Sequence, residues 1–212
     1  MLDMIRNHLQ TIDSYDQVIS RFEGVEGFLR AKEGFALTLL AMHGPASGAI
    51  VEIGSFKGRS TCFLALGASL AGREKVVAID HFFGSPEHQK GQQFEDPAIV
   101  QSGSTLPTFL ANLAAASLSG QVEVMQMSSV EAAAGWSRPI RLLFIDGDHS
   151  YDETKRDFEQ FAPHVVPEGI ICFHDVGPWP GVTRFFRELV DQGSWKHRFT
   201  THSLAAVSRD AA

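Results

Sequence analysis

Short apolar runs alternate with helical stretches along most of the chain. The apolar runs are rich in β-branched residues and predict buried strands over residues 49–53, 75–80, 122–125, 140–145 and 169–173. Helices are predicted between and around them, over residues 31–42, 62–71, 108–118, 130–135, 151–162 and 183–189. Strands that alternate with helices in this way favour a doubly wound, mostly parallel α/β sheet with helices on both faces.

The two ends of the chain depart from this alternation. Residues 1–30 predict one or two amphipathic helices, with Ile5, Leu9 and Ile12 at helical spacing. Residues 195–200 and 204–208 predict a closing antiparallel pair of strands at the far end of the sheet. We therefore expect one domain over residues 1–212, with a helical cover over 1–45 and a Rossmann-like core over 46–212.

Composition narrows the class of protein. The hydrophobic and charged contents of 44% and 20% are those of a soluble globular chain. A net charge of −7 and the lack of a basic run argue against a nucleic-acid groove, and no apolar run is long enough to span a membrane. Cys62 and Cys172 lie in apolar stretches, which predicts buried thiols in a cytoplasmic protein.

The stretch AIVEIGSFKGRST, residues 49–61, predicts a strand, a glycine turn and a helix that Ser60 and Thr61 cap. A dinucleotide fingerprint needs a glycine where the backbone approaches a pyrophosphate, but Phe56 stands there. The acid Glu52 instead suits a ligand with a positive charge, such as the ammonium group of S-adenosylmethionine. An ordinary strand-to-helix turn is the alternative interpretation.

Asp80 ends the second strand, near the spacing at which an acid accepts hydrogen bonds from a ribose diol. A strand-end turn residue is the alternative role. The polar segment 81–103 that follows has no period and favours a lid over the ligand, with His81, Phe82 and Phe83 near cofactor or substrate. A surface loop with a small aromatic anchor is the other interpretation of this segment.

Polar residues also follow the later strands. Ser128 and Ser129 come after the third strand, where a hydroxyl can meet an adenine edge, although a helix cap is favoured for Ser129. The fourth and fifth strands deliver acids and imidazoles to the same edge: Asp146, Asp148, His149, His174 and Asp175. Such a cluster suits a divalent ion with open positions for substrate oxygens. The alternative is a set of strand-end caps and ion pairs.

Three motifs in this order resemble the class I S-adenosylmethionine-dependent methyltransferases, in particular methyltransferase family 24 with its macrocin, novobiocin-pathway and cephalosporin-pathway enzymes. The motifs are VEIGSFKGRST (51–61), IDGDHSY (145–151) and FHDV (173–176), and the resemblance runs from about Gly27 to Ser208. It implies a seven-stranded sheet with an antiparallel final strand and S-adenosylmethionine as cofactor.

The resemblance also implies roles by position. The cofactor would be bordered by Glu52, Gly54 and Ser60 at its methionine end, by Asp80 at the ribose, and by Ser128 and Ser129 near adenine. Ser55, His81 and Asp146 are the other expected cofactor-binding residues. The related catechol and caffeoyl-CoA O-methyltransferases hold a divalent metal, Mg²⁺ or Mn²⁺, at the places of Asp146, His174 and Asp175. Two departures are that Met127 and Ser128 replace a common Gly-acid pair, and that His174 stands where relatives often carry a carboxylate.

The expected function is therefore metal-assisted O-methylation of a small-molecule hydroxyl, on a sugar or natural product. The general base would be His149, with a pKa near neutral, or Asp148. An NAD-dependent oxidoreductase and a non-catalytic cofactor-binding module are the alternatives. We expect a small-molecule substrate and no nucleic-acid or membrane partner, and a homo-oligomer stays open.

Overall fold

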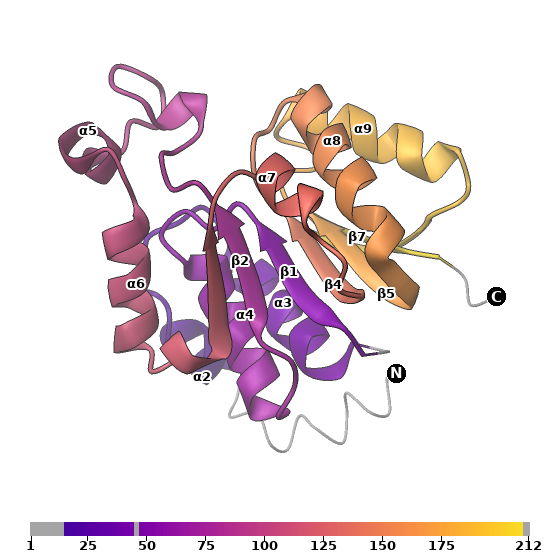
Figure 1. The fold of residues 1–212 in the computed structure, drawn as a ribbon, viewed down its shortest axis with the longest axis horizontal. Coiled ribbons are helices and arrows are strands. Elements are labelled where there is room, and N and C mark those ends of the chain that lie inside the picture. Colours follow the sequence, from indigo (N-terminus) through magenta and orange to yellow (C-terminus); the bar gives the residue numbers. More distant parts are fainter. Residues whose placement is uncertain (1–14, 45–46, 210–212) are drawn as a thin grey trace.

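The computed structural model describes residues 15–44 and 47–209, so the predicted helical positions Ile5, Leu9 and Ile12 lie outside the described residues. One sheet has the strand order β3-β2-β1-β4-β5-β7-β6 (Figure 1). Strands β1 to β5 are parallel, whereas β7 runs antiparallel to both of its neighbours. The strands are β1 (Ala49–Ile53), β2 (Val76–Asp80), β3 (Val122–Gln126), β4 (Ile140–Ile145), β5 (Val165–Phe173), β6 (Lys196–Thr201) and β7 (Leu204–Ser208). The predicted doubly wound fold with its reversed final strand is confirmed.

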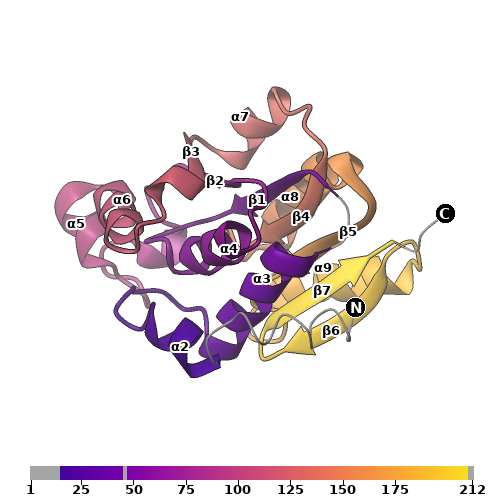
Figure 2. The same cartoon turned by 90° about the horizontal axis from the view of Figure 1, so that it is seen from below.

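Helices lie on both sides of the sheet, as Figure 2 shows. The first side carries α2 (Tyr15–Ser20), α3 (Ala31–His43), α4 (Arg59–Leu70) and α6 (Leu106–Ala115). The second side carries α7 (Ser129–Ala134), α8 (Tyr151–Phe161) and α9 (Pro180–Asp191). Short elements complete the chain: α5 (Pro97–Ser102), η1 (Pro86–His88), η2 (Ser119–Gln121) and η3 (Ala162–His164).

Alternation along the strands divides the core into two apolar clusters, one on each face. On β1, Ile50 joins the cluster under α3 and α4, while Val51 and Ile53 join the cluster under α8 and α9. Every residue of β1 and β4 is buried, which explains why both strands are apolar apart from Glu52 and Arg141. Cys62 and Cys172 are buried free thiols, as predicted.

Two helices have a different N-cap from the one that the sequence predicts. Helix α4 begins at Arg59, and its N-cap is Gly58 in the left-handed region with φ of 89°, so the prediction that Ser60 and Thr61 cap this helix is wrong. Helix α7 has Ser128 as its N-cap instead of Ser129, because Glu131 stands three residues later and completes a capping box.

The segment 81–103 has more regular structure than its polar composition predicts. It contains η1 and helix α5, which Asp96 caps by accepting hydrogen bonds from the backbone of Ala98 and Ile99. The side chain of Lys57, which is only 4% exposed, forms an ion pair with Asp96 at 2.7 Å. This contact ties the segment to the glycine turn.

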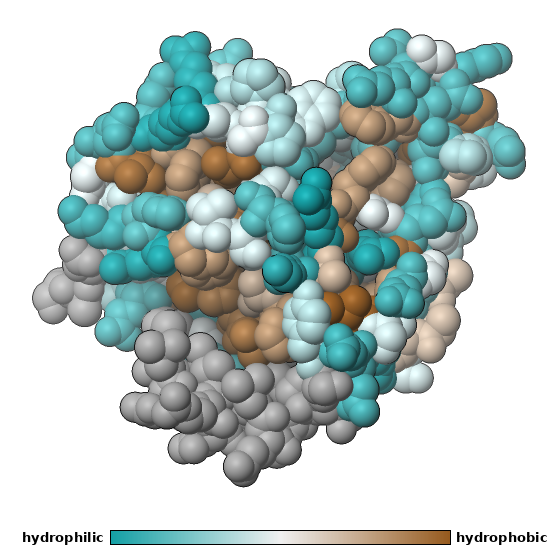
Figure 3. Space-filling view, turned by 180° about the vertical axis from the view of Figure 1, so that it is seen from behind, coloured by the Kyte–Doolittle hydropathy of each residue, from teal (hydrophilic) through white to brown (hydrophobic). Residues whose placement is uncertain are grey.

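The surface mixes polar and apolar side chains. On the face opposite that of Figure 1, apolar residues reach the surface in patches between polar ones (Figure 3). Within residues 15–44 and 47–209, no helix combines the length and hydropathy needed to cross a bilayer.

Candidate active site

A cleft of about 540 Å³ opens where β1, β2, β4 and β5 end. Its walls include Gly54 after β1, Asp80 at the end of β2, Asp146 after β4 and Asp175 after β5. Parallel strands bring their carboxyl ends to one edge, and this is where open α/β sheets bind ligands. The volume lies within the range of small-molecule and cofactor sites.

The glycine turn after β1 is fixed by Asp80. One oxygen of this carboxylate accepts hydrogen bonds from the backbone N–H of Ser55 at 2.7 Å and of Phe56 at 2.9 Å. Gly54 has φ of 85°, and a Cβ atom there would lie 2.1 Å from the carbonyl oxygen of Asp146. Only glycine fits this crossing of the β1 and β4 ends, which explains the residue type.

Glu52 lies behind the turn. Its carboxylate is fully buried and does not line the cleft, whereas Gly54, Ser55 and Ser60 do. Oε2 of Glu52 accepts hydrogen bonds from Ser55 at 2.7 Å and from Thr61, and Oε1 has no partner among the described residues. Burial raises the pKa of Glu52 to about 7, against hydrogen bonds from the neighbouring hydroxyls that lower it. The carboxyl group therefore holds the turn together from inside.

The predicted ribose and adenine residues all line the cleft. His81 is about half exposed, with its ring stacked on Phe83 and its Nδ1 accepting the Phe83 backbone N–H at 2.9 Å. The Ser128 hydroxyl donates to the Glu131 carboxylate at 2.7 Å, so the capping box occupies it. Ser129 keeps its hydroxyl on the cleft side, beside Asp157.

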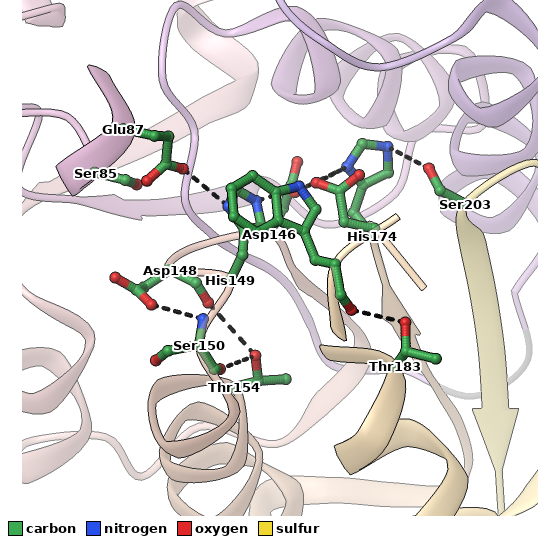
Figure 4. A network of polar contacts seen from close by, with 12 residues as sticks. Ser85, Glu87, Asp146, Asp148, His149, Ser150, Thr154, His174, Thr183 and Ser203 are labelled. Carbon is green, nitrogen blue, oxygen red and sulfur yellow. Dashed lines mark hydrogen bonds and ion pairs between the residues drawn. The ribbon is translucent and has the colours of Figure 1, made fainter. Parts of the chain in front are cut away.

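The acids and imidazoles after β4 and β5 form one polar network, which Figure 4 shows from close by. His174 is buried, with Nδ1 at 3.0 Å from Asp146 and 3.4 Å from Asp175 and Nε2 at 3.3 Å from Glu33. Burial favours the neutral ring, but the Asp146 charge and the hydrogen bonds to Asp146, Asp175 and Glu33 raise the pKa of His174 to about 12. His174 is therefore a buried imidazolium among carboxylates.

His149 bridges the cleft between Asp175, at 3.1 Å from its Nε2, and Glu87 of the 81–103 segment, at 2.9 Å from its Nδ1. Its ring stacks on Trp179 with the ring centres 4.3 Å apart. Burial lowers the pKa of His149, but the hydrogen bonds to Asp175 and Glu87 outweigh it and raise the pKa to about 10. The prediction of a near-neutral pKa is wrong for this arrangement, because two carboxylates hold the proton on the ring.

Asp148, the other candidate base, lies apart from this ion-pair network. Its Oδ1 accepts the backbone N–H of Ser150 at 2.7 Å at the start of α8, as Figure 4 shows. The carboxylate still lines the cleft. Its geometry is that of a turn at a helix start, which is one of the roles open from the sequence.

A divalent ion fits the donor atoms on this edge. Asp146, His149 and Asp175 each offer a ligand atom, and these atoms lie within 4.8 Å of one another. Two carboxylate oxygens and an imidazole suit Mg²⁺ or Mn²⁺. The histidine of this group is His149, whereas the sequence pointed to His174. Both rings have each nitrogen facing a carboxylate, so either would have to lose its proton to bind an ion. Asp175 has φ of 60°, in the left-handed region, which Asp adopts more readily than most other non-glycine residues.

Glu33 is a site residue that sequence reasoning missed. It comes from α3 and is fully buried, and besides His174 it accepts hydrogen bonds from the Ser203 backbone and hydroxyl, both at 2.8 Å, and from the Arg30 N–H at 2.7 Å. Burial favours its protonated form, but the His174 contact lowers the pKa of Glu33 to about 2. Its spacing to the buried Leu37 and Ala41 places Glu33 on the inner face of α3, and this was the available signal.

An aromatic group at the mouth of the cleft was also missed. Phe28 lies within 6.0 Å of Phe56, His88 and Phe94, measured between ring centres, although its own side chain is 58% exposed. The four rings come from the segment before α3, the glycine turn and the 81–103 segment. They form an apolar rim, called here the aromatic rim, on the cleft wall.

Comparisons with solved structures agree with this fold. An O-methyltransferase from Bacillus cereus, solved with SAH, has a TM-score of 0.63 and 17% identity, with 96% of each chain covered. TomG of Streptomyces achromogenes, an O-methyltransferase of tomaymycin synthesis solved with SAM, has a TM-score of 0.62 and 16% identity, covering 98% of this chain and 95% of that one. CalS11, a TDP-rhamnose 3′-O-methyltransferase of calicheamicin biosynthesis, has a TM-score of 0.58 and 18% identity, covering 95% of this chain and 90% of that one.

The family comparison goes further than the fold. The model described as "Methyltransferase domain" matches residues 51–176, more than half of the chain, from the glycine turn after β1 to the residues after β5. The chain therefore belongs to methyltransferase family 24, within the class I S-adenosylmethionine-dependent methyltransferases.

Proposed function

We propose that this methyltransferase transfers the methyl group of S-adenosylmethionine to a hydroxyl oxygen of a small molecule, a natural product or a sugar. The main supporting observation is that the glycine turn, Asp80 and the Asp146–His149–Asp175 group all line one cleft. The tomaymycin and TDP-rhamnose enzymes among the structural relatives support this substrate class.

The cofactor lies along the ends of β1, β2 and β3 in this proposal. Its methionine part contacts Gly54, Ser55 and Ser60, while Glu52 supports the turn from behind. The ribose hydroxyls donate to Asp80, whose carboxylate is held in place by three backbone N–H groups. His81 lies beside the ribose and the serines after β3 lie near the adenine.

The acceptor lies beside Asp146 and under the aromatic rim. A divalent ion held by Asp146, His149 and Asp175 would lower the pKa of the acceptor hydroxyl. Asp148 would take the hydroxyl proton where His149 holds the ion, and either His149 or Asp148 would take it where His149 does not. His149 acts as base only when the pull of Asp175 and Glu87 on its proton is relieved, because both carboxylates stabilise the imidazolium. The aromatic rim, Trp179 and the glycine turn would orient the acceptor and the cofactor relative to each other.

Calorimetry with S-adenosylhomocysteine tests the cofactor part of this proposal. The wild type should bind one equivalent, and Asp80→Ala should weaken binding at least tenfold by removing a charged acceptor from two ribose hydroxyls. Asp152→Asn, at an exposed position on α8, is the matched control. Binding of NADH in place of S-adenosylhomocysteine would instead favour the oxidoreductase.

Methyl transfer from labelled S-adenosylmethionine to a panel of hydroxylated natural products and nucleotide sugars tests the reaction. Activity that EDTA abolishes and Mg²⁺ or Mn²⁺ restores supports the metal-assisted reaction. Cofactor binding without transfer to any hydroxyl would favour the non-catalytic module.

A further inference from the structure

The cleft wall beside Ser129 holds a buried carboxylate with no role so far. Asp157 of α8 is 3% exposed and lines the cleft. Its Oδ1 has no hydrogen-bond partner among the described residues. A buried acceptor left unsatisfied costs about 1–3 kcal/mol, so such atoms in native proteins usually have a partner. A hydrogen-bond donor bound in the cleft would supply this partner.

Ser129 and Gly147 border the Asp157 carboxylate. Ser129, which also lines the cleft, lies beside its carboxylate and favours the ionised form. Across from it stands Gly147, where a Cβ atom would lie 3.4 Å from Oδ2 of Asp157. That distance is an ordinary van der Waals contact, so Gly147 lies directly against the carboxylate. Burial raises the pKa of Asp157 to about 6, so the group is ionised above neutral pH and is then an acceptor only.

We propose that Asp157 recognises the adenine of S-adenosylmethionine, with Oδ1 accepting a hydrogen bond from the exocyclic amine. This inference rests on the proposed function, which places the adenine near the serines after β3. Of those serines, Ser128 is occupied by the Glu131 carboxylate. The buried carboxylate behind Ser129 is then the acceptor that an adenine amine at this end of the cleft can reach.

The chemistry of the base supplies a direct test. Hypoxanthine carries a carbonyl oxygen where adenine carries its amine, so an ionised carboxylate there meets an acceptor instead of a donor. A site built around one hydrogen bond rejects an analogue that cannot make it. Asp157 should therefore favour S-adenosylhomocysteine over S-inosylhomocysteine by at least about tenfold at about pH 8.

The experiment is a calorimetric comparison of the two ligands on the full chain. In Asp157→Ala the preference for the adenine ligand should shrink to within about threefold, because the acceptor is gone. Asp157→Asn keeps the side-chain shape and, since its amide can donate to the hypoxanthine carbonyl, should narrow or reverse the preference. Glu159→Gln, at a 62% exposed position on the same helix, should keep the wild-type ratio.

The outcomes separate the two proposals. A wild type that does not bind S-adenosylhomocysteine refutes the proposed function. A wild type that binds it, with the same adenine-to-hypoxanthine ratio in Asp157→Asn, refutes the role of Asp157 and leaves the function standing. Because Asp157→Asn is nearly isosteric, it decides the question even where Asp157→Ala fails to fold.

Discussion

Glu52 offers the sharpest prediction, because its carboxyl group is fully buried beneath the glycine turn. The substitution Glu52→Gln removes the titrating proton and keeps an oxygen for the hydroxyls of Ser55 and Thr61, which both donate to Oε2. Its amide would occupy the place of Oε1, which has no partner among the described residues. The variant should therefore fold and differ from the wild type mainly in how its stability depends on pH.

The size of the change in unfolding free energy follows from the pKa of Glu52. Burial raises the pKa of Glu52 from its ordinary 4.5 to about 7 in the folded protein, so folding favours the protonated form. The stabilisation is fully present below about pH 4.5 and is lost as the pH rises to about 7. One pKa unit corresponds to about 1.4 kcal/mol, and the rise from 4.5 to about 7 therefore corresponds to about 3 kcal/mol.

Urea unfolding followed by tryptophan fluorescence measures this effect at several pH values. The other titrating groups contribute equally to both proteins, so their contribution drops out of the difference in unfolding free energy between Glu52→Gln and the wild type. This difference should shift by about 3 kcal/mol in favour of the variant between about pH 4.5 and 8. Glu23→Gln, at an exposed position, should show a constant difference. A constant difference for Glu52→Gln as well would refute the buried, protonated carboxyl group.

Three further substitutions test the rest of the site. Asp146→Ala should abolish methyl transfer while the dissociation constant of S-adenosylhomocysteine stays within about tenfold of the wild type, and full activity in this variant would contradict the acceptor site. Glu33→Ala should lower the unfolding free energy by about 3–5 kcal/mol in urea titrations, because it leaves the His174 imidazolium buried without its partner, and a loss below about 1 kcal/mol would contradict that ion pair. Phe28→Ala should raise KM for the acceptor more than for the cofactor, with stability changed by less than about 1 kcal/mol because the ring is exposed; an unchanged acceptor KM would remove the aromatic rim from the substrate site.

The sheet could be predicted because each strand is marked by the apolar composition of its own segment. Strand β4 has the predicted bounds, since its residues are apolar except for Arg141 and this run is too short for a helix. The helix starts were harder to predict from the sequence. Glu52 draws the Thr61 hydroxyl away from capping, and that competition arises only once strand and helix are packed together.

The site was predicted in outline but not in its connections. Asp146, His149 and Asp175 follow strand ends and therefore share an edge in any parallel sheet. Glu33 lies in α3, before β1, and no residue near it in the sequence indicates that its partner is His174 after β5. Asp157 lies between the buried Thr154 and Phe161 on one face of α8, a period that marks it as buried but does not say what it faces.

A crystal structure with S-adenosylhomocysteine and Mn²⁺ tests the central claim most directly. The account predicts homocysteine density along Gly54 and Ser55, a ribose on Asp80, an adenine amine facing Asp157, and an anomalous manganese peak between Asp146 and Asp175. Cofactor density elsewhere on the protein, or a cleft that stays empty at saturating ligand, would contradict it.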